Sequence, residues 1–217
     1  RQLEKGWENT LSTSFVVNAG NTEFFKLESG FRSDFYSGLY YTFLSGNLEY
    51  KEASEKIITQ NGFLHLRSMR YLTDIIAAEA FLQKEFNRFI SLQDRNLAGA
   101  GGRFKIAHKE RDKDSARVFD LNLGIGAMFE YEEYNTNPDV ITRIIRSTNY
   151  ISFYWILNDV FSIQNVGYFQ FDFANLNDFR ILEEGNMIFS INETLKFIVS
   201  LKYRFDNDPI PGVKKYD

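Results

Sequence analysis

The sequence contains no cysteine, only three prolines and only two histidines among its 217 residues. Without cysteine the chain has no disulfide, no thiolate nucleophile and no cysteine-based metal site. The scarcity of proline and the lack of any low-complexity run exclude a disordered or linker-rich chain. No apolar run approaches the roughly 18 residues that a membrane-spanning helix needs. The length is typical of a single domain, residues 1–217.

A large charge of one sign is also lacking. The formal net charge is −4, so nothing indicates the basic surface that nucleic acids attract, and we predict no nucleic-acid partner. Aromatic residues are abundant instead: 22 Phe, 12 Tyr and 2 Trp make up 17% of the chain, beside 25% charged residues. This combination predicts apolar surface interleaved with polar surface, and not a thick core wrapped in charge.

Apolar and polar residues alternate with a period of two along most of the chain. In residues 118–131 one face carries Phe119, Leu121, Leu123, Ile125, Ala127, Phe129 and Tyr131. The other face carries Val118, Asp120, Asn122, Gly124, Gly126, Met128 and Glu130. Such alternation is typical of a strand that lies between an apolar phase and a polar one.

Similar patterns, some of them less regular, recur in further segments. These are residues 7–18, 23–35, 38–51, 59–72, 75–88, 94–108, 144–157, 160–173, 179–192 and 195–206. Together with 118–131 they predict eleven strands of about 12–15 residues, whereas strands of soluble sheets usually have about five or six.

The predicted connections are of two alternating kinds. Short links at 36–37, 73–74, 158–159 and 192–193, with the longer KERDKDS (109–115) as an exception, take turns with more variable loops. Those loops are at 19–22, 52–58, 90–93, 135–143 and 174–178. Short turns at one rim and longer loops at the other predict an up-and-down meander that needs no helix.

A sheet with one apolar face has to cover that face, either with its own interior or with lipid. The polar face is rich in charge: Glu28, Arg32, Arg67, Glu79, Glu85, Arg95, Arg103, Lys105, Glu130, Arg146, Lys202 and Arg204. This charge and the strand length favour a membrane barrel, with a soluble barrel or sandwich as the alternative. We therefore predict an all-β fold: a closed, antiparallel, up-and-down transmembrane β-barrel.

Several short stretches then point to a known family. They are GNT (20–22), LAGAGGRFKI (97–106), LNLGIGAMFEYEEY (121–134) and YRFDNDPIPGVKKYD (203–217). In their order and spacing the chain resembles the bacterial family of salt-induced outer-membrane proteins, domain of unknown function number 481. The resemblance implies a β-barrel in the outer membrane of a Gram-negative-type bacterium, surrounded by outer-membrane lipid. It implies no activity and no catalytic residues.

The two histidines are the natural candidates for acid–base chemistry. His65 lies on the polar face near Arg67, and His108 ends a strand beside KERDKDS. A lone interior histidine can act as a general base, but we interpret His65 as a hydrogen-bonded residue of the lumen and His108 as a rim residue. No Asp or Glu stands at a ligand-like spacing from either. We therefore predict no metal site, no cofactor and no enzymatic activity, and keep His65 as a candidate polar site.

The remaining candidate site is a network of lumen charges. Its members are Arg67, Glu79, Glu85, Arg95, Arg103 and Lys105. Glu79 and Glu85 lie on one predicted strand and the three basic residues from 95 to 105 on the next, within reach of cross-strand pairing. We interpret the set as an internal salt-bridge network, with a selective pore as the alternative. The acidic EYEEY (130–134) is expected to be a solvated rim, with a cation-binding site as the alternative.

These features predict a structural or partner-binding barrel subunit of an envelope assembly, with other envelope proteins as its partners. A narrow pore for small solutes or ions is one alternative, and a lipid-modifying enzyme or protease that uses His65 is another. Because single-chain bacterial barrels have an even number of strands, we expect DNDPIPGVKKYD (206–217) to be an external loop. A twelfth, closing strand is then expected after Asp217.

Overall fold

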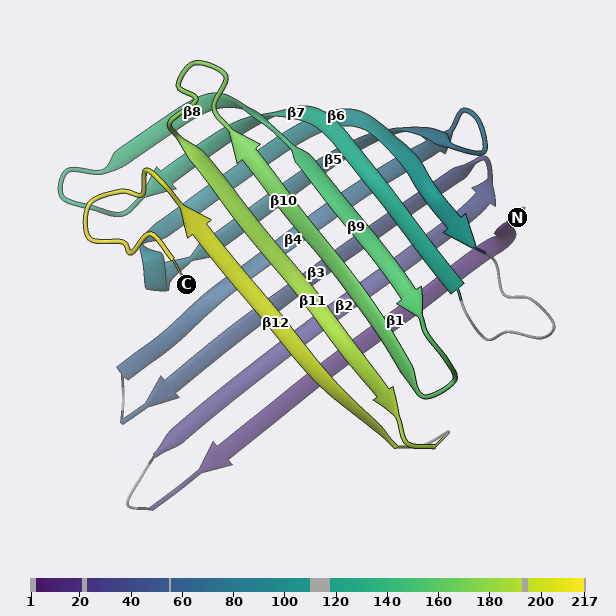
Figure 1. The fold of residues 1–217 in the computed structure, drawn as a ribbon. Helices are drawn as coiled ribbons and strands as arrows, with labels where there is room; N and C mark the ends of the chain where they lie inside the picture. Colours follow the sequence, from purple (N-terminus) through teal and green to yellow (C-terminus); the bar gives the residue numbers. More distant parts are fainter. Residues whose placement is uncertain (1–2, 21–22, 55, 110–117, 193–194, 217) are drawn as a thin grey trace. The chain divides into compact units, whose positions relative to one another are not determined.

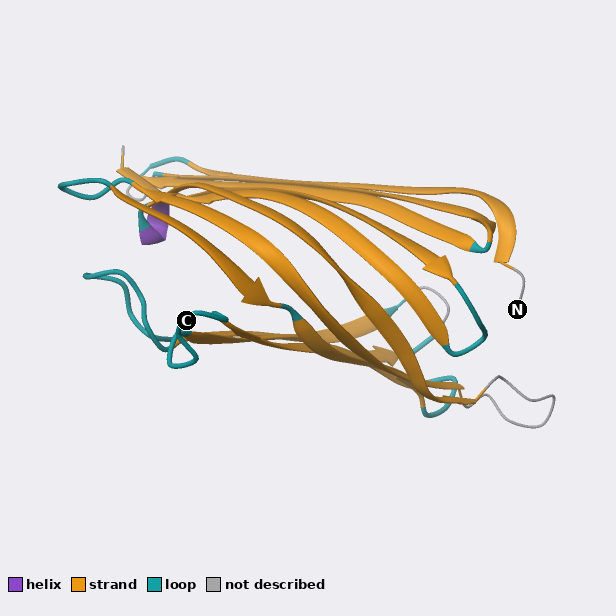
Figure 2. Ribbon diagram, turned by 90° about the horizontal axis from the view of Figure 1, so that it is seen from above, coloured by secondary structure: helices purple, strands orange, loops and turns teal. Residues whose placement is uncertain are grey.

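The computed structural model describes residues 3–20, 23–54, 56–109, 118–192 and 195–216, and they are almost entirely β-strand (Figures 1 and 2). The strands are β1 (Leu3–Asn18), β2 (Phe24–Gly38), β3 (Tyr40–Ala53), β4 (Lys56–Tyr71), β5 (Ile76–Asn87), β6 (Leu92–Lys109), β7 (Val118–Tyr134), β8 (Val140–Ser147), β9 (Asn149–Ile156), β10 (Phe161–Phe171), β11 (Phe179–Ser190) and β12 (Lys196–Asp206). One short 3-10 helix, η1 (Arg88–Ile90), lies between β5 and β6. No helix among these residues is long and apolar enough to span a bilayer.

The twelve strands form one antiparallel, up-and-down sheet. Its order is β1-β2-β3-β4-β5-β6-β7-β9-β10-β11-β12, and β8 pairs with β7 beside this path. Apart from β8 and β9, which both pair with β7, strands that follow each other in the chain are therefore neighbours in the sheet, as the alternating long and short connections predicted.

Ten of the eleven predicted strands correspond to single strands of the structure, and the segment 144–157 does not. The strand is interrupted there at Thr148. The backbone N–H of Thr148 donates to the carbonyl of Gly126 on β7 (2.9 Å). β8 and β9 lie on either side of this break, and both pair with β7. The prediction of one strand was wrong because alternation of side chains does not register a local break in the ladder.

Two predicted loops are shorter than expected. β8 begins at Val140, inside the predicted loop 135–143. The predicted loop 52–58 is almost all strand, since β3 and β4 pair as far as Ala53 and Lys56. Main-chain groups gain hydrogen bonds by extending the ladder even where the side chains are polar. The link KERDKDS lies, after Lys109, outside the described residues.

The chain divides into two compact units. The first unit comprises Arg1–Tyr71, Glu79–Ala100 and Met128–Ile144, and the second comprises Leu72–Ala78, Gly101–Ala127 and Ile145–Asp217. β1 to β4 thus belong to the first unit and β9 to β12 to the second. β5, β6, β7 and β8 contribute residues to both.

In the first unit the two faces of the sheet are inverted relative to a water-soluble protein. Across β1 and β2, Leu11 lies opposite Phe31 and Phe15 opposite Leu27, yet Leu11 is 78% exposed. On the other side of the sheet, charged residues of β4 to β7 are buried, among them Arg67, Glu79, Arg95, Glu130 and Glu132. We call the first side the apolar face and the second the polar face.

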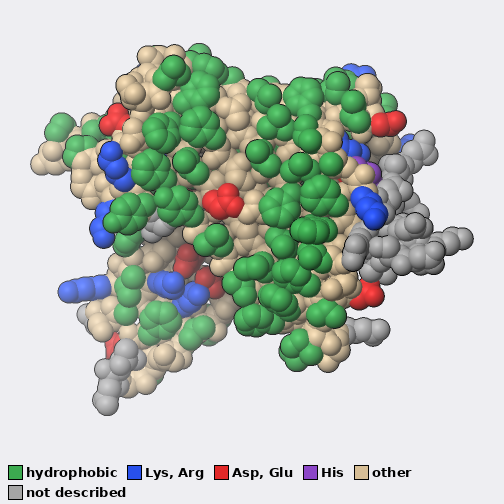
Figure 3. Space-filling model, in the orientation of Figure 1, with side chains coloured by type: hydrophobic (Ala, Val, Ile, Leu, Met, Phe, Trp, Pro, Cys, Tyr) green, Lys and Arg blue, Asp and Glu red, His purple; other side chains and the backbone are tan. Residues whose placement is uncertain are grey.

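The second unit has the same inversion. Hydrophobic side chains gather over β9 to β12 (Figure 3), and those of Ile151, Phe169 and Phe197 are exposed. On the opposite face Arg146 is 0% exposed, and Arg180 and Asp206 are also buried. Both units therefore leave apolar side chains outside and keep charged side chains covered.

Candidate functional site

Arg95 on β6, in the first unit, makes several polar contacts with neighbouring strands. Its Nε donates to Oε1 of Glu132 on β7 (2.6 Å), and its Nη2 donates to the same oxygen. Its Nη1 donates to Oε2 of Glu85 on β5 (3.3 Å). Arg95 thus ties together strands β5, β6 and β7 through two carboxylates.

This contact continues on both sides as a chain of hydrogen bonds. Toward β4, the Nε2 of Gln83 donates to Glu85 (3.1 Å), and the Oε1 of Gln83 lies 2.8 Å from Nδ1 of His65. Because that amide oxygen only accepts, Nδ1 carries the proton. Toward β8, the hydroxyls of Tyr134 (3.1 Å) and Thr142 (3.4 Å) donate to Oε2 of Glu132.

We call the seven residues His65, Gln83, Glu85, Arg95, Glu132, Tyr134 and Thr142 the His65–Thr142 chain. They come from five consecutive strands, β4 to β8, and all lie on the polar face of the first unit. Period-two alternation explains this placement, because residues 83 and 85, and 132 and 134, share a face.

A second ion pair lies beside this chain. Nη1 of Arg67 is 3.5 Å from Oε2 of Glu79, and both side chains are buried. The Arg67 guanidinium also lies over the ring of Phe81, 5.1 Å from its centroid. Such cation–π contact strengthens where water is excluded.

Aromatic rings form a ladder next to these charges. Ring centroids are 4.9 Å apart for Tyr36 and Tyr41, 5.8 Å for Tyr41 and Phe43, 5.5 Å for Phe43 and His65, and 5.7 Å for His65 and Phe81. The ladder needs Gly99 on β6, because a Cβ there would overlap the Phe81 ring. His65 is therefore held by rings on both sides and by Gln83. Among the residues that the structure describes, Ser45, its partner in the β3–β4 register, makes no hydrogen bond to it.

Arg32 extends the polar face toward β2. Its Nε and Nη2 donate to Asp34 (2.8 and 2.9 Å), and its Cζ lies 4.1 Å from the Phe43 ring centroid. The hydroxyl of Tyr41 donates to Oδ1 of the same carboxylate (2.5 Å).

The structure unites four of the six predicted network residues in the first unit. Glu85 pairs with Arg95, and Arg67 pairs with Glu79. Arg103 and Lys105 lie on the part of β6 that belongs to the second unit. His108, expected as a rim residue, has Nδ1 3.3 Å from Oδ2 of Asp120, also in the second unit.

Sequence reasoning missed Glu132, the partner that Arg95 holds most closely. The expectation that EYEEY (130–134) is a solvated rim was wrong, because Glu132 is 2% exposed and Glu130 is also buried. The period-two pattern could have predicted the burial of both residues, because Glu130 lies on the polar face of 118–131 and Glu132 continues it at a spacing of two.

The second unit carries its own ion pairs on the polar face. The two Nη atoms of Arg146 donate to the two carboxylate oxygens of Asp178, each at 3.0 Å. Nε of Arg180 donates to Oδ2 of Asp206 (2.8 Å). Neither of these two ion pairs was predicted, because the partners are too far apart in the sequence for pattern reasoning to pair them.

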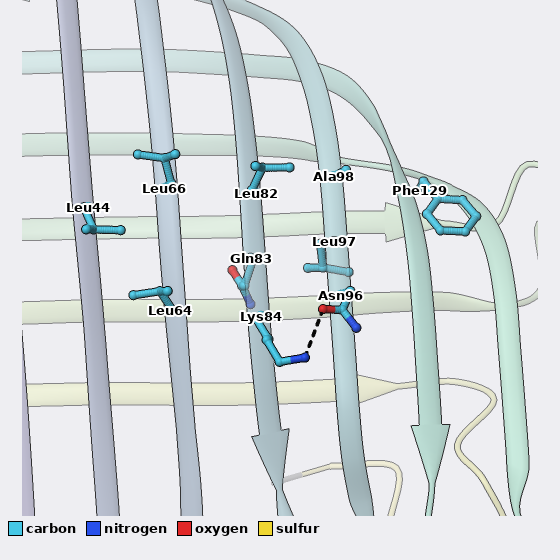
Figure 4. Close-up of a pocket in the computed structure, with 10 residues that line it drawn as sticks. All are labelled: Leu44, Leu64, Leu66, Leu82, Gln83, Lys84, Asn96, Leu97, Ala98 and Phe129. Carbon is cyan, nitrogen blue, oxygen red and sulfur yellow. Dashed lines mark hydrogen bonds between the residues drawn. The ribbon is translucent and has the colours of Figure 1, made fainter.

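A groove of about 430 Å3 opens on the first unit, lined mainly by apolar-face side chains of β3 to β7 (Figure 4). Its apolar lining includes Leu44, Leu64, Leu66, Leu82 and Phe129. At one end Nζ of Lys84 lies 2.8 Å from Asp94 and 3.5 Å from the amide oxygen of Asn96. The lining of the groove is therefore mainly apolar.

Comparison with known proteins gives a family and no activity. A family model described as "Protein of unknown function, DUF481" matches residues 11–217. No curated protein and no solved structure matched the chain. Since the match covers nearly the whole sequence, the chain belongs to the DUF481 family.

Proposed function

We propose that this chain forms a closed β-barrel in the bacterial outer membrane, where it is a structural, partner-binding component of the cell envelope and not an enzyme. The inverted burial of the two faces is the observation that carries the proposal. Leu11, Phe15 and Ile151 are exposed on the apolar face, while Arg95, Glu132 and Arg146 are buried on the other. Large exposed apolar surface marks contact with a membrane or a partner.

Lipid on the apolar face accounts for this inversion better than water does. In outer-membrane barrels the lipid-facing side is apolar and the interior is polar. A soluble barrel would hide the apolar face and expose the ion pairs. Closure of the sheet would also leave no unpaired strand edge in the hydrocarbon layer.

Aromatic–arginine contacts at the strand ends add support. Near the start of β3, Arg70 lies over the ring of Tyr40 on the apolar face (5.7 Å). Near the end of β7, Arg143 lies over the ring of Tyr131 (5.5 Å). Amphipathic rings and arginines are typical of membrane–water interfaces.

The geometry of His65 argues for a structural role. Its ring lies between Phe43 and Phe81, and its Nδ1 is engaged by Gln83. A general base needs a nucleophile or substrate proton within about 3 Å, and Ser45 makes no such contact in the described structure. The second alternative, a lipid-modifying enzyme or protease that uses His65, is therefore not supported by a histidine–serine pair among the described residues.

The aromatic ladder favours a narrow pore as a second candidate function. Rings from Tyr36 to Phe81, with Arg32 and Arg67 against them, form a surface on which polar or planar solutes can stack. Recordings from the folded protein in planar bilayers separate the two functions. Current steps whose ion selectivity changes in the Arg67→Glu variant would establish a pore. The absence of any current from the folded protein would support the structural role instead.

Membrane fractionation tests the proposal itself. The protein should sediment with outer-membrane vesicles and migrate differently on gels before and after heating, as folded barrels do. A protein that stays in the soluble fraction, or that does not resist extraction by alkaline buffer, would refute it.

A further inference from the structure

The apolar face of the second unit has a polar pair in its middle. On β10 this face carries Phe161, Ile163, Asn165, Gly167, Phe169 and Phe171, and on β11 it carries Phe179, Ile181, Glu183, Gly185, Met187 and Phe189. Acidic atoms are surrounded there by hydrophobic side chains over β11 (Figure 3). A carboxylate at such a position is costly in a bilayer and usually has a function.

Asn165 and Glu183 lie flat on the sheet because a glycine stands opposite each of them. The β10–β11 register pairs Asn165 with Gly185 and Gly167 with Glu183. A Cβ at Gly167 would lie 2.6 Å from Oε2 of Glu183, and one at Gly185 would lie 3.0 Å from Nδ2 of Asn165. The two glycines thus create the space that the polar groups occupy.

The pair leaves hydrogen-bonding capacity unused. Nδ2 of Asn165 donates to Oε1 of Glu183, and in the described part of the chain this is the one hydrogen bond that the carboxylate accepts. A carboxylate has about four acceptor positions, and an amide nitrogen has a second hydrogen. Lipid chains supply no donor, so a donor from elsewhere would stabilise Glu183.

We propose that a second copy of the chain supplies it, and that two barrels associate through this patch of β10 and β11. The proposal rests on the membrane location proposed above. The patch is self-complementary, since each copy offers one free amide hydrogen and one free carboxylate oxygen. About a two-fold axis, Asn165 of each copy donates to Glu183 of the other, which is the isologous arrangement typical of dimers.

Thiol cross-linking in native outer membranes tests this directly, because the chain has no cysteine of its own. Met187→Cys puts one thiol beside the patch, and Leu66→Cys puts one on the apolar face of the first unit. The native side chains are matched in exposure, at 40% and 39%. With a flexible bis-maleimide, Met187→Cys should give a covalent dimer and Leu66→Cys should not. Equal yields from the two positions would overturn the proposal, as would a cross-linked product with the mass of a different protein.

Second substitutions, added to the Met187→Cys variant, test whether the Asn165–Glu183 pair causes the two copies to associate. Glu183→Leu should lower the dimer yield roughly 10-fold, because two hydrogen bonds across the interface are lost. Glu183→Gln keeps a hydrogen-bond acceptor and should retain the yield. An unchanged yield in Glu183→Leu would refute the assignment. The folded, heat-sensitive gel band of each variant, with its sedimentation in outer membranes, separates this result from failure of the membrane location.

Discussion

The guanidinium of Arg95 donates two hydrogen bonds to one oxygen of Glu132, and both side chains are almost completely buried. A buried pair of this kind is not by itself a large source of stability, because both charges lose their hydration. Its importance lies in what happens when one partner is removed, since the other is left as an uncompensated buried charge.

Arg95→Leu should therefore reduce the free energy of unfolding by about 3–5 kcal/mol. Lys84→Leu is the matched control, because Lys84 forms an exposed pair with Asp94 on the other face of the same strands and should change stability by about 0–1 kcal/mol. Urea unfolding in lipid vesicles measures both. Equal effects would show that the buried pair has no special role. The double variant Arg95→Leu/Glu132→Leu should recover part of the loss.

Ile151 and Ser152 are neighbours on opposite faces of β9, and they report which face meets lipid. Ser152 pairs with Asn122 and Val166 on the polar face, whereas Ile151 is exposed on the apolar face. In a bilayer Ile151→Arg should cost about 2–4 kcal/mol near the midplane, and Ser152→Arg should cost less. Folding yield into vesicles measures the difference. In a soluble protein an arginine at the exposed position 151 would be harmless, and that outcome would contradict the membrane proposal.

Gly124 on β7 is needed for the position of the Tyr150 ring, which a Cβ at residue 124 would overlap. Gly124→Ala should therefore destabilise the protein by about 1–3 kcal/mol through overpacking. Gly6→Ala is the control, since nothing lies within 4 Å of a Cβ there. Tyr150→Leu should relieve most of the strain, so the double variant should be more stable than the sum of the single effects predicts. Strict additivity would show that the two residues do not interact.

His65→Phe should separate structure from catalysis. The substitution keeps a ring between Phe43 and Phe81 and removes the hydrogen bond to Gln83, at a cost of about 1–3 kcal/mol. If His65 is structural, the variant should restore any envelope defect of a deletion strain as well as the native protein does. Loss of complementation by a folded variant would instead indicate that the imidazole has a chemical role.

The alternation of residues 118–131 was enough to predict both faces of β7, and the same pattern located ten strands. Side chains at a spacing of two share a face whatever the rest of the chain does. Contacts between distant segments were not predictable in this way. Arg146 and Asp178 meet only because β8 and the end of β10 are brought together, as the bridge between Arg146 and Asp172 records. The break at Thr148 was missed because it concerns the pairing of the backbone, and backbone groups leave no trace in the identity of side chains.

Asn165 and Glu183 illustrate a different limit. Each interrupts an otherwise apolar face, and a single polar residue in a strand pattern reads as noise. The structure shows that the two interruptions coincide, each facing a glycine of the neighbouring strand. To predict that Asn165 and Glu183 lie side by side, one needs the register of β10 and β11, and the sequence pattern does not give it.

The His65–Thr142 chain has a consequence for how that register is chosen in the first unit. Sliding one strand past the next by two residues keeps every apolar side chain on the apolar face, so hydrophobicity alone cannot distinguish the two alignments. The same slip would carry Gln83 away from His65, or Arg95 away from Glu132. Polar side chains that contribute little net stability can thus select one alignment of β4 to β8 among several that lipid would accept equally. The network therefore fixes the register of these strands once neighbouring strands have paired.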